Sequence, residues 1–185
     1  MLCALLNLNM NKFLFILYIF CTTTNAHAQL QWTSVGIDGL TCSQCFYSVE
    51  QSIRSMRSVQ QVEMNLNDSE ARVTQNIEGY SQILQLGEQI NNAGFTVRFL
   101  TVTLRIDSTF DIAASKINSR VGTLVLLDNT IIYRDSTYTF QIIDKRYCKK
   151  NTYKRWSSYI NSQPLEDKKN RNHLFVIAAS PSKNH

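Results

Sequence analysis

Two cysteines three positions apart, Cys42 and Cys45 in the stretch GLTCSQC, are the residues best suited to chemistry in this sequence. Thiolates are soft donors, and a pair of them on a short loop suits Cu(I), and secondarily Zn(II) or Cd(II), better than hard cations that prefer oxygen. A structural zinc site would need four ligands. Two ligands leave the metal open to a partner's thiolates, so the pair indicates a site for capture or delivery.

The sequence around the pair predicts a strand followed by a helix. Residues 30–38 (LQWTSVGID) alternate as a strand does, with one apolar-leaning face formed by Thr33, Val35 and Ile37. Residues 43–57 carry the apolar stripe of an amphipathic helix, formed by Val49, Ile53 and Met56. This order places Cys42 in the loop after the strand and Cys45 in the first helical turn. Unpaired backbone N–H groups and the helix dipole favour thiolates there.

Further along, the pattern predicts a hairpin, a second helix and a fourth strand. VQQVEMNL and EARVTQN alternate around the turn residues Asn67-Asp68-Ser69. A second helical stripe, formed by Ile83, Leu86 and Ile90, ends at Ala93-Gly94 before the strand that begins with FTVRFL. The order βαββαβ predicts a ferredoxin-like α+β fold over residues 30–104, with two helices on one face of a four-stranded antiparallel sheet.

The stretch VGIDGLTCSQCFYSVEQSIRSM, together with VQQVEMNL, EARVT and INNAGFTV, resembles the heavy-metal-associated domains of copper-chaperone type, whose motif is GMTCxxC. The resemblance covers about residues 33–98. It implies that Cys42 and Cys45 are the metal ligands and that the partner is a protein that donates or accepts the metal. It also implies that Leu40 replaces a buried Met and that Phe95 is the aromatic residue that shields the loop.

Residues 105–185 predict a smaller α+β region. GTLVLLDNTIIYRDSTYTFQIID indicates two or three strands, and a helix over about 149–160 and a final strand LFVIAAS complete it. Two arrangements stay open: a separate domain, or an extension of the first sheet.

The N-terminus predicts a secretory signal. Lys12, an apolar run from Phe13 to Cys21 and a polar stretch that ends in Ala26-His27-Ala28 predict cleavage before Gln29. The apolar run is about half of the roughly 20 residues that a membrane-spanning helix needs. We therefore divide the chain into a signal peptide (1–28), the metal-binding domain (29–104) and the C-terminal region (105–185), and expect a periplasmic or secreted protein.

Two other functions use the same cysteine pair. A thiol-disulfide oxidoreductase also places CxxC at a helix N-terminus. However, Thr41 precedes Cys42 where an aromatic residue is typical, and the chain's only prolines, Pro164 and Pro181, lie near the C-terminus. In the third hypothesis the pair is oxidised to a structural disulfide in an interaction protein.

The remaining residues point to packing and solubility. We expect Cys148 to be a small buried apolar residue. His27, His173 and His185 do not lie at the spacings typical of metal ligands. A Ser/His/Asp triad, a phosphate-binding loop and a paired-carboxylate site are all absent from the sequence, so we do not expect an enzyme.

Positive charge gathers at the C-terminus. Residues 145–185 hold ten Lys or Arg against two acids, whereas residues 1–144 hold nine against twelve. The basic segment favours attraction to an anionic membrane surface, or only confers solubility. A secreted location argues against a nucleic-acid partner.

Overall fold

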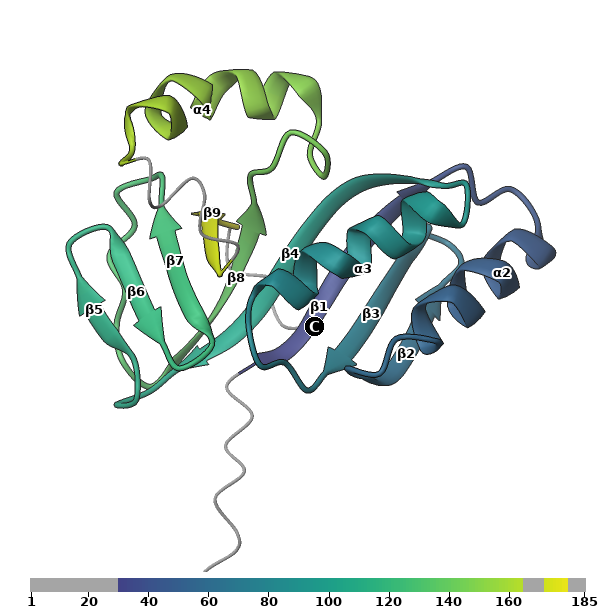
Figure 1. The fold of residues 1–185 in the computed structure, drawn as a ribbon, viewed down its shortest axis with the longest axis horizontal. Helices are drawn as coiled ribbons and strands as arrows, with labels where there is room; N and C mark the ends of the chain where they lie inside the picture. The colour runs from purple at the N-terminus through teal and green to yellow at the C-terminus, as the bar shows by residue number, and fades with distance from the viewer. Residues whose placement is uncertain (1–29, 165–171, 180–185) are drawn as a thin grey trace, which may run out of the picture.

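The computed structural model describes residues 30–164 and 172–179, which form one nine-stranded sheet with three helices (Figure 1). The N-terminal elements are β1 (Leu30–Asp38), α2 (Ser43–Arg54), β2 (Val59–Asn65), β3 (Glu70–Gln75), α3 (Ser81–Asn92) and β4 (Thr96–Ile106). The C-terminal elements are β5 (Asp111–Ala113), β6 (Lys116–Ser119), β7 (Gly122–Leu126), β8 (Ser136–Ile142), α4 (Lys150–Ser162) and β9 (His173–Ala178). The predicted signal peptide lies outside the described residues.

The N-terminal half has the predicted ferredoxin-like fold. Its strands stand in the order β2-β3-β1-β4, and every neighbouring pair is antiparallel. The predicted inward face of β1 is buried, since Thr33, Val35 and Ile37 are all fully inaccessible to solvent. α2 and α3 cover this face with Val49, Ile53, Ile83, Leu86 and Ile90.

α2 ends three residues earlier than predicted. Ser55 is its C-cap, and the Met56 N–H donates to the Ile53 carbonyl three residues back, which tightens the last turn. Met56 still packs against the core from outside the helix. The apolar stripe therefore identified the buried face correctly but not the end of the helix.

The C-terminal half extends the first sheet. β4 pairs with β1 on one side and with β8 on the other, and β9, β7, β6 and β5 follow. The expected boundary after residue 104 falls within β4. Of the nine strands, β5 and β6 were not anticipated from the sequence; they are three and four residues long, too short for a clear alternating pattern.

α4 covers the C-terminal strands on the face opposite α3. Along β9, Leu174 and Val176 belong to the same hydrophobic core as the buried residues of α2 and α3. Phe175 and Ile177 lie on the opposite face of the sheet and pack with α4. The inward side of α4, formed by Tyr153, Trp156 and Ile160, lies in this second cluster. No helix in residues 30–164 or 172–179 combines the length and apolar character needed to cross a membrane.

Candidate metal site

The cysteine loop connects the end of β1 to the start of α2. Gly39 has φ +93°, a backbone conformation that suits glycine because it has no Cβ. The next residue, Leu40, turns inward and is only 8% exposed, which anchors the loop on the core. Its burial matches the role expected for this position.

Cys42 caps the N-terminus of α2. Its carbonyl accepts from the N–H groups of Cys45 and Phe46 at 3.0 and 3.2 Å, which starts the helix. Its sulfur accepts from the Cys45 N–H, with an N–Sγ distance of 3.2 Å. The Cys42 side chain therefore already accepts a helix N–H group, that of Cys45, at a position that also stabilises a thiolate.

The two cysteine side chains lie together and differ in exposure. Cys42 is exposed, whereas Cys45 is half-buried and packs against the core. A hydrogen bond from the Cys42 side chain lowers the pKa of the Cys45 thiol, and hydrogen bonds from Thr41 and from the Cys42 backbone act in the same direction against the effect of burial. Both sulfurs are free thiols, so the pair can take up a soft cation from solvent.

An aromatic ring stands beside the loop. Phe95, at the turn between α3 and β4, is half-buried, and its Cδ1 would lie 3.7 Å from a Cβ placed on Gly39. The expected shielding residue is therefore next to the loop.

Other candidate ligands lie elsewhere. Cys148 is buried in the α4 cluster, and burial, followed by the charge of Asp144, raises the pKa of its thiol. Met64 packs against the core. Within the part of the chain that the structure describes, no group of three or more His, Cys, Asp or Glu residues could hold a metal. Cys42 and Cys45 therefore remain the two candidate ligands.

Sequence reasoning missed Arg98, which lies near this loop. Its side chain reaches Asp38, the residue that precedes Gly39, with an Nη1–Oδ1 distance of 3.2 Å. No motif signals this contact, because it depends on how β4 is aligned with β1.

A search of curated proteins finds no match to the chain. Among solved structures, this chain is similar to the N-terminal domain of PacS from Synechocystis PCC6803, with 24% identity over 37% of this chain and 94% of that one, and a TM-score of 0.33. The yeast copper transporter domain Ccc2a is 25% identical over 35% of this chain and 86% of that one, with a TM-score of 0.32.

A family model for the heavy-metal-associated domain matches residues 34–96. The match begins in β1, contains the cysteine loop and both helices of the N-terminal half, and ends at the start of β4. Over residues 34–96, this chain therefore resembles a heavy-metal-associated domain.

Proposed function

We propose that the protein binds one Cu(I) ion between Cys42 and Cys45 and exchanges it with thiolates of a partner protein. The observation that carries this proposal is the pairing of an exposed cysteine with a half-buried one at the N-terminus of α2. Two soft donors fit Cu(I) first and Zn(II) second. Binding displaces the two thiol protons, so uptake is easier where thiolates are stabilised.

The different exposure of the two sulfurs supports an order of transfer. A partner's thiolate first joins the metal from the solvent side, next to Cys42. Cys42 then leaves, because its side chain is exposed and free to move, while Cys45 is held by its contacts with the core. Cys45 leaves last, when a second partner thiolate arrives.

We propose a periplasmic or secreted location, supported by the sequence of residues 1–28, which predicts cleavage before Gln29. Such a compartment is oxidising, so Cys42 and Cys45 would need to be kept reduced for metal loading. We also propose that the protein is not an enzyme, and that metal exchange is its activity.

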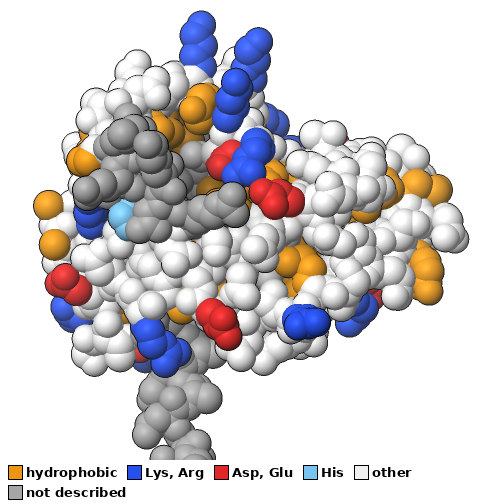
Figure 2. Space-filling view, in the orientation of Figure 1, with side chains coloured by type: hydrophobic (Ala, Val, Ile, Leu, Met, Phe, Trp, Pro, Cys, Tyr) orange, Lys and Arg blue, Asp and Glu red, His pale blue; other side chains and the backbone are white. Residues whose placement is uncertain are grey.

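We further propose that α4 draws the protein to an anionic membrane surface. Six exposed cations lie in the N-terminal half of α4 or just before it: Lys145, Arg146, Lys149, Lys150, Lys154 and Arg155. Arg146 is paired with Glu88 and Asp144. Figure 2 shows Lys and Arg side chains projecting from the part of the surface that α4 occupies. The first turn of α4 contains no acidic residue, so the positive end of its dipole adds to these charges.

Vesicle sedimentation tests the membrane proposal. The mature protein should bind phosphatidylglycerol vesicles at low salt and dissociate from them at high salt, and it should not bind phosphatidylcholine vesicles. A Lys149→Glu/Lys150→Glu/Lys154→Glu variant should lose this binding. Equal binding by the variant and the wild type, or no binding by either, would exclude α4 as a membrane-binding surface.

Titration of the reduced mature protein with Cu(I) tests the metal site. We expect one equivalent bound by the wild type and none by a Cys42→Ser/Cys45→Ser variant. A Cys148→Ser variant is the matched control, because it removes a thiol but keeps the pair, and it should bind as the wild type does. Equal uptake by all three proteins would reject the site.

The oxidoreductase hypothesis makes a different prediction for the same proteins. It requires catalysis of insulin reduction by the wild type that disappears in the Cys42→Ser/Cys45→Ser variant. We expect no catalysis by either protein.

A further inference from the structure

Three segments meet near the cysteine loop at the side chain of Arg98, and we propose that Arg98 positions this loop for metal binding. The three segments are the end of β1, the turn of the β2–β3 hairpin and the start of β4. This inference rests on the proposed metal site, and it adds a residue outside the cysteine motif to that site.

A β-bulge directs Arg98 towards the loop. Gly36 pairs with Phe99 and Ile37 pairs with Val97, so Arg98 is the extra residue of β4 at this point. A bulge bends its strand and re-aims the extra side chain, and bulges are frequent beside functional sites. The Arg98 guanidinium also lies 5.5 Å from the centroid of the Phe99 ring, which limits the directions it can take.

Arg98 makes contact with each of its neighbours through a different atom pair. Nη1 donates to Asp38 Oδ1 at 3.2 Å, and Nη2 donates to the Asp68 carbonyl at 2.9 Å. Nη2 also lies 3.7 Å from Glu70 Oε1. The Arg98 side chain is 27% exposed, so these contacts are only partly screened by solvent.

Because Asp38 directly precedes the cysteine loop, the contacts that hold its side chain also restrain the start of the loop. Asp38 is the last residue of β1, and Gly39, the first loop residue, follows it with φ +93°. The adjacent Ile37 N–H donates to the Ser69 carbonyl of the hairpin turn at 2.9 Å. Arg98 therefore fixes the start of the loop, while the Cys42 cap on α2 fixes its end.

Residues 30–53 contain no Lys, Arg or His, so the cation that pairs with Asp38 comes from outside the cysteine motif. A loop held in its metal-bound shape loses less conformational freedom when the metal arrives, and this preorganisation raises affinity. Removing the Arg98 side chain should therefore loosen residues 39–41 in the metal-free protein and weaken binding.

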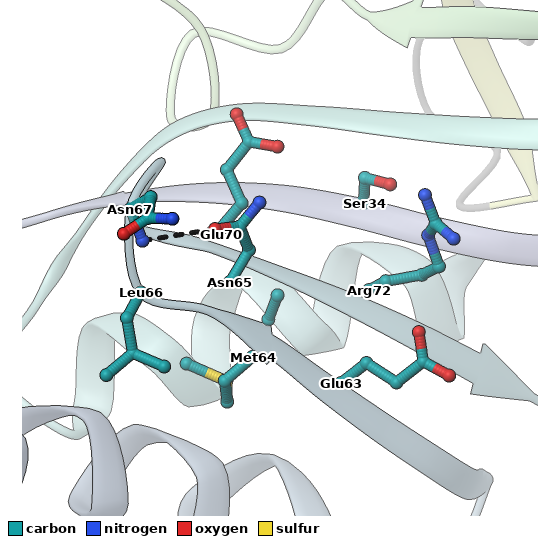
Figure 3. A pocket seen from close by; sticks show the side chains of 9 residues that line it. Ser34, Glu63, Met64, Asn65, Leu66, Asn67, Glu70 and Arg72 are labelled. Atoms are coloured by element: carbon teal, nitrogen blue, oxygen red, sulfur yellow. Dashed lines mark hydrogen bonds between the residues drawn. The ribbon is translucent and has the colours of Figure 1, made fainter. Parts of the chain in front are cut away.

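Arg72 provides a matched control on the same face of the sheet. Its guanidinium lies 5.0 Å from the centroid of the Trp32 ring. Figure 3 shows Arg72 and Glu70 on the opposite side of the hairpin from Met64 and Leu66; all four line an open hollow of about 520 Å³ that does not include the cysteines. Arg72→Gln removes one cation from this face without touching Asp38.

The experiment measures two properties of the full mature chain for the wild type, Arg98→Gln, Arg98→Lys and Arg72→Gln. The first is amide hydrogen exchange at residues 39–41 without metal. The second is Cu(I) affinity in competition with a chelator. Arg98→Gln should exchange several times faster at these residues and bind Cu(I) about 3- to 10-fold more weakly, the range that one partly exposed ion pair and one charged hydrogen bond support.

Conservative and paired variants separate positioning from general stability. Arg98→Lys keeps the charge but cannot reach three acceptors at once, so it should fall between the wild type and Arg98→Gln. Adding Asp38→Asn to Arg98→Gln should weaken binding little further, because both changes break the same contact. Arg72→Gln should match the wild type in both measurements.

Unchanged exchange at residues 39–41 in Arg98→Gln would overturn the inference, as would equal Cu(I) affinities for Arg98→Gln and the wild type. In the latter case the metal site itself stands if the Cys42→Ser/Cys45→Ser variant still fails to bind. If the wild type takes up no Cu(I), the proposed function fails together with the role in metal binding, while the exchange data report on the loop separately.

Discussion

Replacing Gly87 with alanine tests whether the two halves of the sheet are packed as one unit. Gly87 lies on the buried side of α3 and faces Tyr147, from the segment between β8 and α4. A Cβ at position 87 would lie 2.6 Å from Tyr147 Cε1 and 2.9 Å from both Cδ1 and Cζ. Tyr147 is fully buried, so its ring cannot swing into solvent to make room.

The expected size of the effect combines two opposing contributions. Alanine in a helix interior is favoured over glycine by about 1 kcal/mol. Overpacking a filled core typically costs about 1–3 kcal/mol, and three ring atoms at these distances put Gly87→Ala towards the upper part of that range. We expect the free energy of unfolding to fall by about 1–2 kcal/mol, which corresponds to a Tm lower by roughly 2–8 °C for a domain of this size.

Urea unfolding and thermal melts of Gly87→Ala and of Gln85→Ala provide the measurement. Gln85 lies on the exposed side of the same helix, so its replacement should change the free energy of unfolding by no more than about 0.5 kcal/mol. In a Tyr147→Leu background, Gly87→Ala should cost much less. A more stable Gly87→Ala protein in the wild-type background would refute the contact between α3 and the C-terminal half.

Three further predictions concern buried tyrosines and cysteines. The Tyr147 hydroxyl is buried with no hydrogen-bond partner among residues 30–164 and 172–179, so Tyr147→Phe should leave stability unchanged or raise it by up to about 1 kcal/mol in urea unfolding. Burial raises the pKa of Tyr80 to about 12, whereas an unfolded tyrosine titrates near 10. The folded state therefore keeps this proton when the unfolded chain loses it, and the stability from neutral Tyr80 is complete below about pH 10 and is lost as pH rises through 12. Urea midpoints between pH 9 and 12 should fall less steeply for Tyr80→Phe, and identical slopes would contradict this. Iodoacetamide should modify Cys148 much more slowly than Cys42 in the folded protein, because Cys148 is 9% exposed and its thiol pKa is raised; mass mapping that finds equal rates would show that the α4 cluster is open.

The N-terminal half was predictable because each of its signals is local. The alternation of Thr33, Val35 and Ile37 identified the buried face of β1, and the helical stripe that includes Val49 and Ile53 placed Cys42 in the loop between the strand and the helix. These features depend on residues within a few positions of one another. Local patterns therefore gave the fold, the loop and the placement of Cys42.

The rest depends on contacts between distant segments. The contact of Gly87 with Tyr147 joins residues 60 positions apart, as does that of Arg98 with Asp38. The larger sheet forms because β4 pairs with β8. An alternating pattern can identify each strand, but it does not say which strand pairs with which. A single sequence indicates which residues are apolar or charged, but not which distant residue each one meets.

The most direct test of the metal site is X-ray absorption at the copper edge of the reduced mature protein loaded with one equivalent of Cu(I). The proposed function predicts a first coordination shell of two sulfur atoms, unchanged in Cys148→Ser and lost in Cys42→Ser/Cys45→Ser. A shell of nitrogen or oxygen atoms, or the same two-sulfur spectrum in the Cys42→Ser/Cys45→Ser protein, would contradict it.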